Sequence, residues 1–197
     1  LVEQLKPKDK VGIVVFQSGA TTAAYLTSLK ERALDKLSSV QVRDGRTAIG
    51  DGLGLAIDMV TSIPNKKKVV ILLSDGVNNA GVIKPPEAIA YAQENNIQVF
   101  TVGMGSEGKT IIGRDWMGRP QYAELDEKLL QQIAQDTGGD YFKAVNERTL
   151  TDIYDKLSEK IEREKEDTSI KDWFILLALI IMGVMLYLES GRFMLLK

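Results

Sequence analysis

One short apolar run constrains the fold of this chain more than any other feature: residues 67–76, Lys-Lys-Val-Val-Ile-Leu-Leu-Ser-Asp-Gly. Its five consecutive apolar residues are typical of a parallel β-strand that is covered on both faces of its sheet. Asp75 follows where the strand ends, and Gly76 allows the backbone to turn sharply. Ligands of open α/β sheets bind outside the carboxyl ends of the strands. The sequence therefore predicts that Asp75 lies at a ligand-binding edge.

A second loop, residues 44–52, opens a helix and contributes Thr47 as the best candidate to meet Asp75 at that edge. A hydroxyl and a carboxylate together suit a hard divalent cation. Two structural alternatives stay open, because Thr47 could only cap its helix and Asp75 could only accept hydrogen bonds from loop amides. Asp51, one helical turn beyond Thr47, either supports a metal ligand or is a solvent-facing carboxylate of the first turn.

The residue types that are missing exclude several classes of chemistry. The chain has no cysteine and no histidine. Disulfides, thiolate metal sites, imidazole bases and Ser-His-Asp triads are therefore excluded. Any metal site must be built from oxygen ligands, which favours Mg²⁺, Ca²⁺ or Mn²⁺. The formal net charge of −2 gives no overall field that attracts nucleic acid.

Strand-like and helix-like segments alternate along most of the chain, which predicts an α/β fold with a doubly wound, mostly parallel sheet. We expect residues 21–26 to form an antiparallel edge strand and residues 103–123 to form a loop or a small hairpin. Asp126 and Asn146 are expected to cap helices. The other expected strands are 11–16, 97–102 and 141–144, and the other expected helices are 29–37, 49–63 and 85–95.

The C-terminal part has a different composition. Residues 159–172 are dense in charges of both signs, which is typical of a solvated stalk helix. Residues 173–188 are sixteen uncharged residues, which span about 24 Å as a helix against a hydrocarbon core of about 30 Å. The alternative is a buried helix or one that covers a groove, but apolar residues on every face and aromatic residues near both ends favour a transmembrane helix. Residues 189–197 form a short tail.

The stretches Thr-Ala-Ile-Gly-Asp (47–51) and Leu-Leu-Ser-Asp-Gly (72–76) resemble the second half of a von Willebrand factor A (VWA) domain. The resemblance is greater to the membrane-anchored, BatA-like branch of the bacterial aerotolerance operon proteins. It covers nearly the whole chain and includes the terminal hydrophobic helix, so a partial VWA domain is expected over residues 1–158. The further matching stretches are residues 9–16, 75–81, 137–142 and 153–154.

This resemblance implies a metal-ion-dependent adhesion site in which Thr47 and Asp75 are two of five ligands. The family's Asp-x-Ser-x-Ser loop is absent from these residues, and Ser18 lacks its spacing. That loop ends the family's first, central strand, which is expected to precede Leu1 and to lie between the strands at 11–16 and 69–74. The resemblance thus implies an N-terminally truncated domain with a gap in its sheet and an incomplete site for Mg²⁺, Ca²⁺ or Mn²⁺.

The resemblance also implies a binding module and not an enzyme, with a partner's acidic side chain completing the metal site. Implied partners are other membrane VWA or Bat-type proteins and a MoxR-type ATPase linked to stress tolerance. The implied location is the bacterial inner membrane, with the VWA domain outside the cytoplasm.

Two alternatives remain open. One is a Rossmann-like nucleotide or phosphate enzyme in which Asp75 coordinates Mg²⁺. The spacing Gly103-x-Gly105-x-x-Gly108 follows a predicted strand and matches a dinucleotide fingerprint, but no convincing helix follows it in the sequence, so it does not favour this alternative. The other is a metal-independent scaffold.

Overall fold

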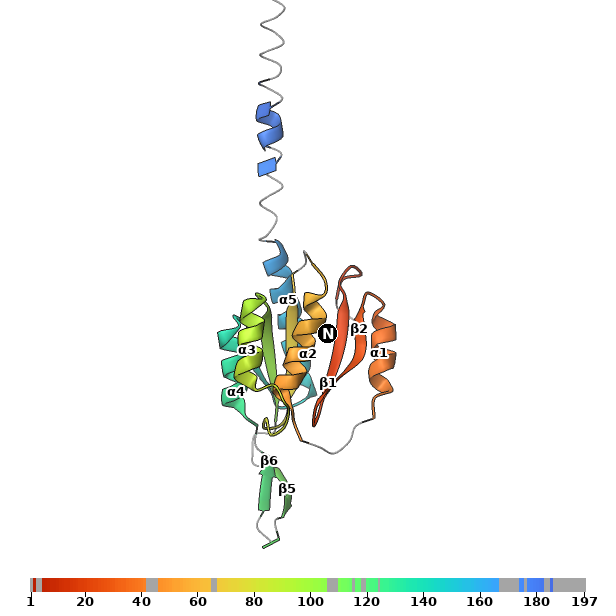
Figure 1. The fold of residues 1–197 in the computed structure, drawn as a ribbon. Coiled ribbons are helices and arrows are strands. Elements are labelled where there is room, and N and C mark those ends of the chain that lie inside the picture. Colours follow the sequence, from red (N-terminus) through yellow and green to blue (C-terminus); the bar gives the residue numbers. More distant parts are fainter. Residues whose placement is uncertain are drawn as a thin grey trace, which may run out of the picture. The chain divides into compact units, whose positions relative to one another are not determined.

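The computed structural model of the chain contains two compact units, Leu1–Asp155 and Lys156–Lys197. The first unit is built from helices and strands that alternate along the chain (Figure 1). The structure describes residues 2, 5–41, 46–64, 67–105, 110–114, 116–117, 120–123, 125–166, 174–175, 177–182 and 185.

The elements follow the predicted alternation closely. The strands are β1 (Val11–Phe16), β2 (Ala20–Thr27), β3 (Val69–Ser74), β4 (Gln98–Met104), β5 (Thr110–Arg114), β6 (Pro120–Ala123) and β7 (Tyr141–Ala144). The helices are α1 (Lys30–Ser38), α2 (Ile49–Thr61), α3 (Pro85–Glu94), α4 (Glu127–Asp136) and α5 (Glu147–Glu166).

A parallel sheet with strand order β3-β4-β7 forms the centre of the first unit. Its core is made by apolar side chains of β3 and β4 against α2, α3 and α4. The parallel α/β fold that the sequence predicts is therefore confirmed. β1 and β2 form a separate antiparallel pair, and β5 and β6 form an antiparallel hairpin, so the edge strand and the small hairpin are also confirmed.

The β1–β2 pair and the parallel sheet are joined by a helix and not by a strand ladder. In the described part of the chain, β1 pairs only with β2, and β3 pairs only with β4 and not with β1. Helix α2 contacts β1, β2 and β3. In Figure 1 this helix stands between the two sheets. The N-terminal end of α2 is thereby placed between the carboxyl ends of β1 and β3.

Burial of β3 differs from what its apolar run suggested. Val70 and Leu72 are buried against the helices, whereas Val69, Ile71 and Leu73 on the other face are only half-buried. The prediction that both faces are covered therefore holds fully for one face alone. This partial exposure is confined to β3, since the neighbouring strand β4 is buried along almost its whole length.

Local sequence signals set several helix ends. The Asp126 side chain accepts a hydrogen bond from the Leu129 backbone N–H at 3.0 Å, and Asn146 accepts one from the Thr149 N–H at 2.9 Å. Both predicted caps are thus confirmed. Pro85 begins α3, where a proline costs no helical hydrogen bond.

The predicted transmembrane segment, residues 173–188, lies partly outside the described residues. Its described residues are helical, and their large apolar side chains are more than half exposed. Within the part of the chain that the structure describes, no helix combines the length and the apolar character needed to cross a membrane. Of the predicted stalk, residues 159–166 belong to α5 and residues 167–172 lie outside the described part.

Candidate functional site

The loop before α2 and the loop after β3 are joined through Thr47. The Thr47 backbone N–H donates to Asn79 Oδ1 at 2.7 Å. Its carbonyl accepts from the backbone N–H groups of Asn79 at 3.0 Å and Ala80 at 3.2 Å. These three hydrogen bonds connect positions that are more than thirty residues apart in sequence. They hold Thr47 at the carboxyl edge of the parallel sheet.

The Thr47 hydroxyl lies against the residue that follows Asp75. A β-carbon placed on Gly76 would lie 3.2 Å from Thr47 Oγ1. Glycine at position 76 therefore lets the hydroxyl approach the backbone at the end of β3. Thr47 is half-buried and Asp75 is exposed, so the two groups share one rim that solvent can reach.

The Thr47 side chain does not cap helix α2, and the Asp75 side chain does not accept hydrogen bonds from loop amides among the described residues. Ala48 is the N-cap residue of α2, and no side chain of its own caps the helix. Instead Asn78 Oδ1 accepts from the Ile49 N–H at 2.8 Å, across from the other loop. Among the described residues, neither Thr47 Oγ1 nor the Asp75 carboxylate has a hydrogen-bond or ion-pair partner. The two oxygen groups are therefore available to a ligand.

Asp51 has a clear structural role in the same region. Its Oδ1 accepts hydrogen bonds from the backbone N–H groups of Val82 at 2.9 Å and Ile83 at 2.7 Å. Gly81, just before them, has a φ of +101°, a conformation that glycine adopts readily. Asp51 thus fixes the far end of the loop after β3. A supporting role toward a metal ligand stays a prediction.

A third loop reaches the same edge from β1. The backbone N–H of Ala48 donates to the Gln17 carbonyl at 2.7 Å, directly after the end of β1. The Thr47 loop is therefore tied to β1 on one side and to the loop after β3 on the other. Sequence patterns gave no signal for this contact, because backbone groups make it.

The two oxygen donors at this edge, the Thr47 hydroxyl and the Asp75 carboxylate, are of the type that a hard cation binds, but they are few. A threonine hydroxyl and a carboxylate are oxygen ligands of the kind that Mg²⁺ and Ca²⁺ take, but these cations need six or more ligands. Within the described residues no group of three or more acidic, histidine or cysteine side chains is placed to hold a metal. Thr47 and Asp75 alone are therefore too few to hold such a cation.

In the part of the chain that the structure describes, no helix directly follows Gly103 and Gly105 of the dinucleotide-like spacing. Gly103 lies in β4 and Gly105 follows its end, and the next described element is strand β5, which begins at Thr110. A dinucleotide fingerprint requires a helix whose N-terminus meets the pyrophosphate. The glycine spacing at this position is therefore not such a fingerprint.

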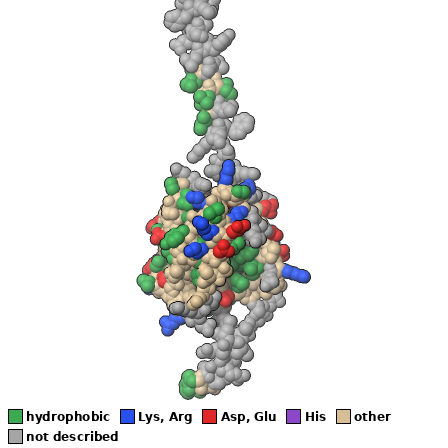
Figure 2. Space-filling model, turned by 90° about the vertical axis from the view of Figure 1, so that its right-hand side faces the viewer, with side chains coloured by type: hydrophobic (Ala, Val, Ile, Leu, Met, Phe, Trp, Pro, Cys, Tyr) green, Lys and Arg blue, Asp and Glu red, His purple; other side chains and the backbone are tan. Residues whose placement is uncertain are grey.

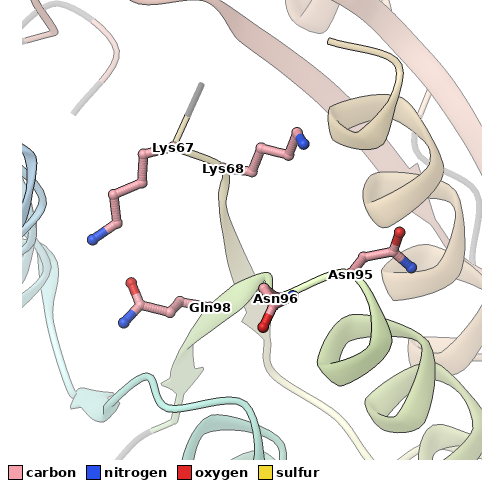
Figure 3. A pocket seen from close by; sticks show the side chains of 5 residues that line it. All are labelled: Lys67, Lys68, Asn95, Asn96 and Gln98. Carbon is pink, nitrogen blue, oxygen red and sulfur yellow. The ribbon is translucent and has the colours of Figure 1, made fainter. Parts of the chain in front are cut away.

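The opposite, amino edge of the sheet has a polar cavity of about 380 Å³. Its lining residues are Lys67, Lys68, Asn95, Asn96 and Gln98 (Figure 3). Lys68 extends toward Asn95, which ends α3, while Lys67 and Gln98 extend to the other side. Positive charge near a helix C-terminus is stabilising, so a structural role accounts for Lys68.

Comparison with known proteins identifies a family for this α/β unit. The family model of the von Willebrand factor type A domain matches residues 1–156. An uncharacterized protein of Borreliella burgdorferi is 26% identical over 170 residues, which are 82% of this chain and 49% of that protein. The chain spans about half the length of the curated relatives that it matches, between 49% and 59%.

Two solved structures are similar over most of both chains. The conserved hypothetical protein BatB of Bacteroides thetaiotaomicron has a TM-score of 0.70 and 29% identity, covering 84% of this chain and 83% of its own. An aerotolerance-related membrane protein of Bacteroides fragilis has a TM-score of 0.65 and 27% identity, covering 81% and 83%. At these identities the likeness extends beyond the fold to a named group of bacterial proteins.

Proposed function

Because this chain belongs to the von Willebrand factor type A family, we propose that it is a membrane-anchored module that binds other proteins through a divalent cation. The observation that carries the proposal is the pair Thr47 and Asp75. Their oxygen atoms occupy one solvent-accessible rim, and neighbouring side chains take over the capping and loop-bonding roles that would otherwise explain them.

In this proposal Thr47 and Asp75 are two ligands of Mg²⁺, with Ca²⁺ or Mn²⁺ as substitutes. The other protein ligands come from a segment before Leu1, and an acidic side chain of the partner fills the last position. The cation lends its positive charge to the rim and attracts that carboxylate. In this proposal the module binds its partner and performs no catalysis.

We further propose that the module is anchored in the bacterial inner membrane by residues 173–188, with its VWA domain outside the cytoplasm. The exposed apolar side chains of the described part of this helix support a lipid environment. The similarity to an aerotolerance-related membrane protein supports the same location. Other Bat-type membrane proteins and a MoxR-type ATPase linked to stress tolerance are the proposed partners.

Metal titration of the natural chain, including its preceding segment, tests the proposal. We expect Mn²⁺ binding, followed by electron paramagnetic resonance, to weaken at least about tenfold in Asp75→Ala and in Thr47→Ala. Asp58→Ala removes an exposed carboxylate that lies on α2 away from the rim, and it should leave the affinity unchanged. Nucleotide binding by the same variants is measured separately by isothermal titration calorimetry.

Unchanged Mn²⁺ affinity in both rim variants would contradict the metal proposal and favour the metal-independent scaffold. Nucleotide binding that depends on Asp75 would favour the enzyme. Loss of Mn²⁺ binding in the rim variants alone, without nucleotide binding, is the result that we expect.

A further inference from the structure

The loop between β3 and α3 presents apolar side chains to solvent, although hydrogen bonds and packing order its backbone. Val82 is 90% exposed and Ile83 is 38% exposed. Asp51 Oδ1 accepts the backbone N–H groups of both residues, and a β-carbon on Gly54 of α2 would lie 2.8 Å from Ile83 Cδ1. An apolar side chain on a loop that is already ordered loses little conformational entropy when another molecule covers it. The loop is therefore suited to an interface.

Val82 and Ile83 line a groove between α2 and α3, two helices that lie side by side on one face of the first unit (Figure 1). The groove has a volume of about 700 Å³, within the range of about 300–1,000 Å³ that is typical of ligand sites. Its other apolar lining residues are Ala20, Gly54, Leu55 and Ala88. The groove therefore has room for a large apolar side chain of another molecule.

The same groove is negatively charged. Its described lining includes three carboxylates, Asp51, Asp58 and Glu87, and no lysine or arginine. Asp58 Oδ1 accepts the Tyr91 hydroxyl at 2.6 Å, and Glu87 Oε2 accepts the Lys84 backbone N–H at 3.0 Å. These hydrogen bonds position the carboxylates, and within the described residues no ion pair neutralises them. The groove therefore favours an apolar group that is accompanied by positive charge.

The groove and the metal rim are neighbouring parts of one surface. A β-carbon on Gly81 would lie 3.0 Å from Asp51 Oδ1, in the groove, and 3.1 Å from the side chain of Ala48, directly after the rim threonine. The loop after β3 also links the two places, because it begins with Asp75 at the rim and reaches Val82 at the groove. A segment that is bound at the rim can thus reach the groove within a few residues.

We propose that the partner segment whose acidic side chain meets the metal rim continues into the α2–α3 groove, where it places a large apolar side chain next to a lysine or arginine. This inference rests on the function proposed for the rim and adds the chemistry of the partner. The partner is acidic over the rim and basic over the groove, so the two charges fix the direction in which its segment lies. The carboxylates of the groove disfavour an anionic lipid surface or a purely acidic segment as the occupant.

Synthetic peptides test this contact on the natural chain, including its preceding segment. The probes are capped peptides that carry a neutral dye and the sequence Asp-(Gly)n-Leu-Lys, with one, two or three glycines as the spacer. Fluorescence anisotropy measures their affinity in Mn²⁺ and in EDTA. We expect the best spacer to bind at least about tenfold more tightly in Mn²⁺, because the rim and the groove then act together.

Val82→Ser should weaken this binding at least about tenfold in Mn²⁺. The double variant Asp58→Asn, Glu87→Gln should also weaken it, since it removes two negative charges and keeps an acceptor oxygen at each position. The matched control is Tyr25→Ser, at an exposed position on β2, and it should leave the affinity unchanged. A peptide with glutamate in place of lysine should bind at least about tenfold more weakly.

Equal affinity of the natural chain and Val82→Ser would overturn the inference, and so would equal binding of the lysine and glutamate peptides. The two proposals fail in different ways. Dependence on Val82 with no dependence on Mn²⁺ would contradict the metal function of the rim and support the groove. Dependence on Mn²⁺ with no dependence on Val82 would support the rim and contradict the groove.

Discussion

Single side-chain oxygens, contributed from positions far apart in sequence, hold the loops at the carboxyl edge together. Asp51, Asn78 and Asn79 each accept backbone N–H groups from the other loop. Thr47 and Asp75 stand between these contacts and make none with their own side-chain oxygens among the described residues. The structural hydrogen bonds at this edge are therefore made by Asp51, Asn78 and Asn79, which leaves Thr47 and Asp75 for the proposed metal ion.

Replacing Asp51 by alanine should destabilise the chain by about 1–3 kcal/mol, because the N–H groups of Val82 and Ile83 lose a charged acceptor. Asp51→Asn keeps the Oδ1 acceptor and loses only the charge, so its cost should be smaller. Urea unfolding followed by circular dichroism measures both free energies. Equal losses in the two variants would show that charge, and not the hydrogen bonds, is what matters at this position.

Tyr141 predicts a decrease of stability at high pH. Burial of its hydroxyl, with the nearby Glu127 carboxylate, raises the pKa of Tyr141 from its ordinary value of 10.0 to about 12. The unfolded chain therefore releases this proton first, and the free energy of unfolding falls as pH rises between about 10 and about 12. Tyr141→Phe should flatten this decrease in chemical unfolding series. The exposed Tyr25→Phe variant is the control and should leave the slope unchanged.

Sequence reasoning succeeded at residues whose partners are close along the chain. Asp126 and Asn146 each cap a helix by accepting the backbone N–H of the residue three positions ahead. The role of Asn78 could not be inferred in this way, because its partner, Ile49, lies 29 residues away. Asn-rich turns are common without any tertiary contact, so the local pattern carried no distinguishing signal.

Helix α2 is the element on which the arrangement of the first unit depends. It contacts both β1 and β3, which share no ladder in the described part of the chain, and its first turn passes close to the backbone of the loop after β3. A β-carbon at Gly50 would overlap the Ile83 carbonyl oxygen. The glycine that weakens the helix by composition thus permits its packing.

The substitution Gly50→Ala has two opposing effects on stability, a gain in helix propensity and a steric clash with the Ile83 backbone. Alanine gains about 1 kcal/mol in a helix, but the Ile83 backbone would have to move, and overpacking of this kind costs about 1–3 kcal/mol or more. We expect a net loss of stability in thermal unfolding. Gly19→Ala, where a β-carbon meets nothing within 4 Å, is the matched control and should stay within about 0.5 kcal/mol of the natural chain. A stabilised Gly50→Ala variant would contradict the close packing.

The order and type of the elements could be predicted from periodicity, since apolar alternation and turn residues are local signals. The partial burial of β3 could not, because an apolar run reports the side chains of a strand and not which neighbours cover them. Val69, Ile71 and Leu73 have the same character as the buried Val70 and Leu72. Only the placement of the helices distinguishes the two faces.

The whole molecule joins an α/β unit to a second unit whose described apolar side chains are exposed. On the face that carries β1, β2 and α1, basic and acidic side chains lie close to one another (Figure 2). The described apolar residues of the second unit, such as Phe174 and Met185, are 69% exposed. Composition did not locate the boundary between the two units at Asp155 and Lys156, because the charge density changes sharply only near residue 173, inside the second unit.

Membrane extraction tests the role of the second unit. When the chain is expressed in bacteria, most of it should stay with the membrane fraction after alkaline carbonate washing, because an exposed apolar helix is costly to keep in water. Deletion of residues 173–197 should release the first unit into the supernatant. Release of the intact chain by the wash would contradict the proposed anchor.

The separation of β1 from β3 has a consequence for how this fold could be completed. Each of these strands has one edge along which the described residues form no ladder. Such an edge offers rows of backbone donors and acceptors to any extended peptide. The unit could therefore be complemented by an extended peptide that pairs with these strand edges, as the fragments of a split reporter protein reassemble in solution.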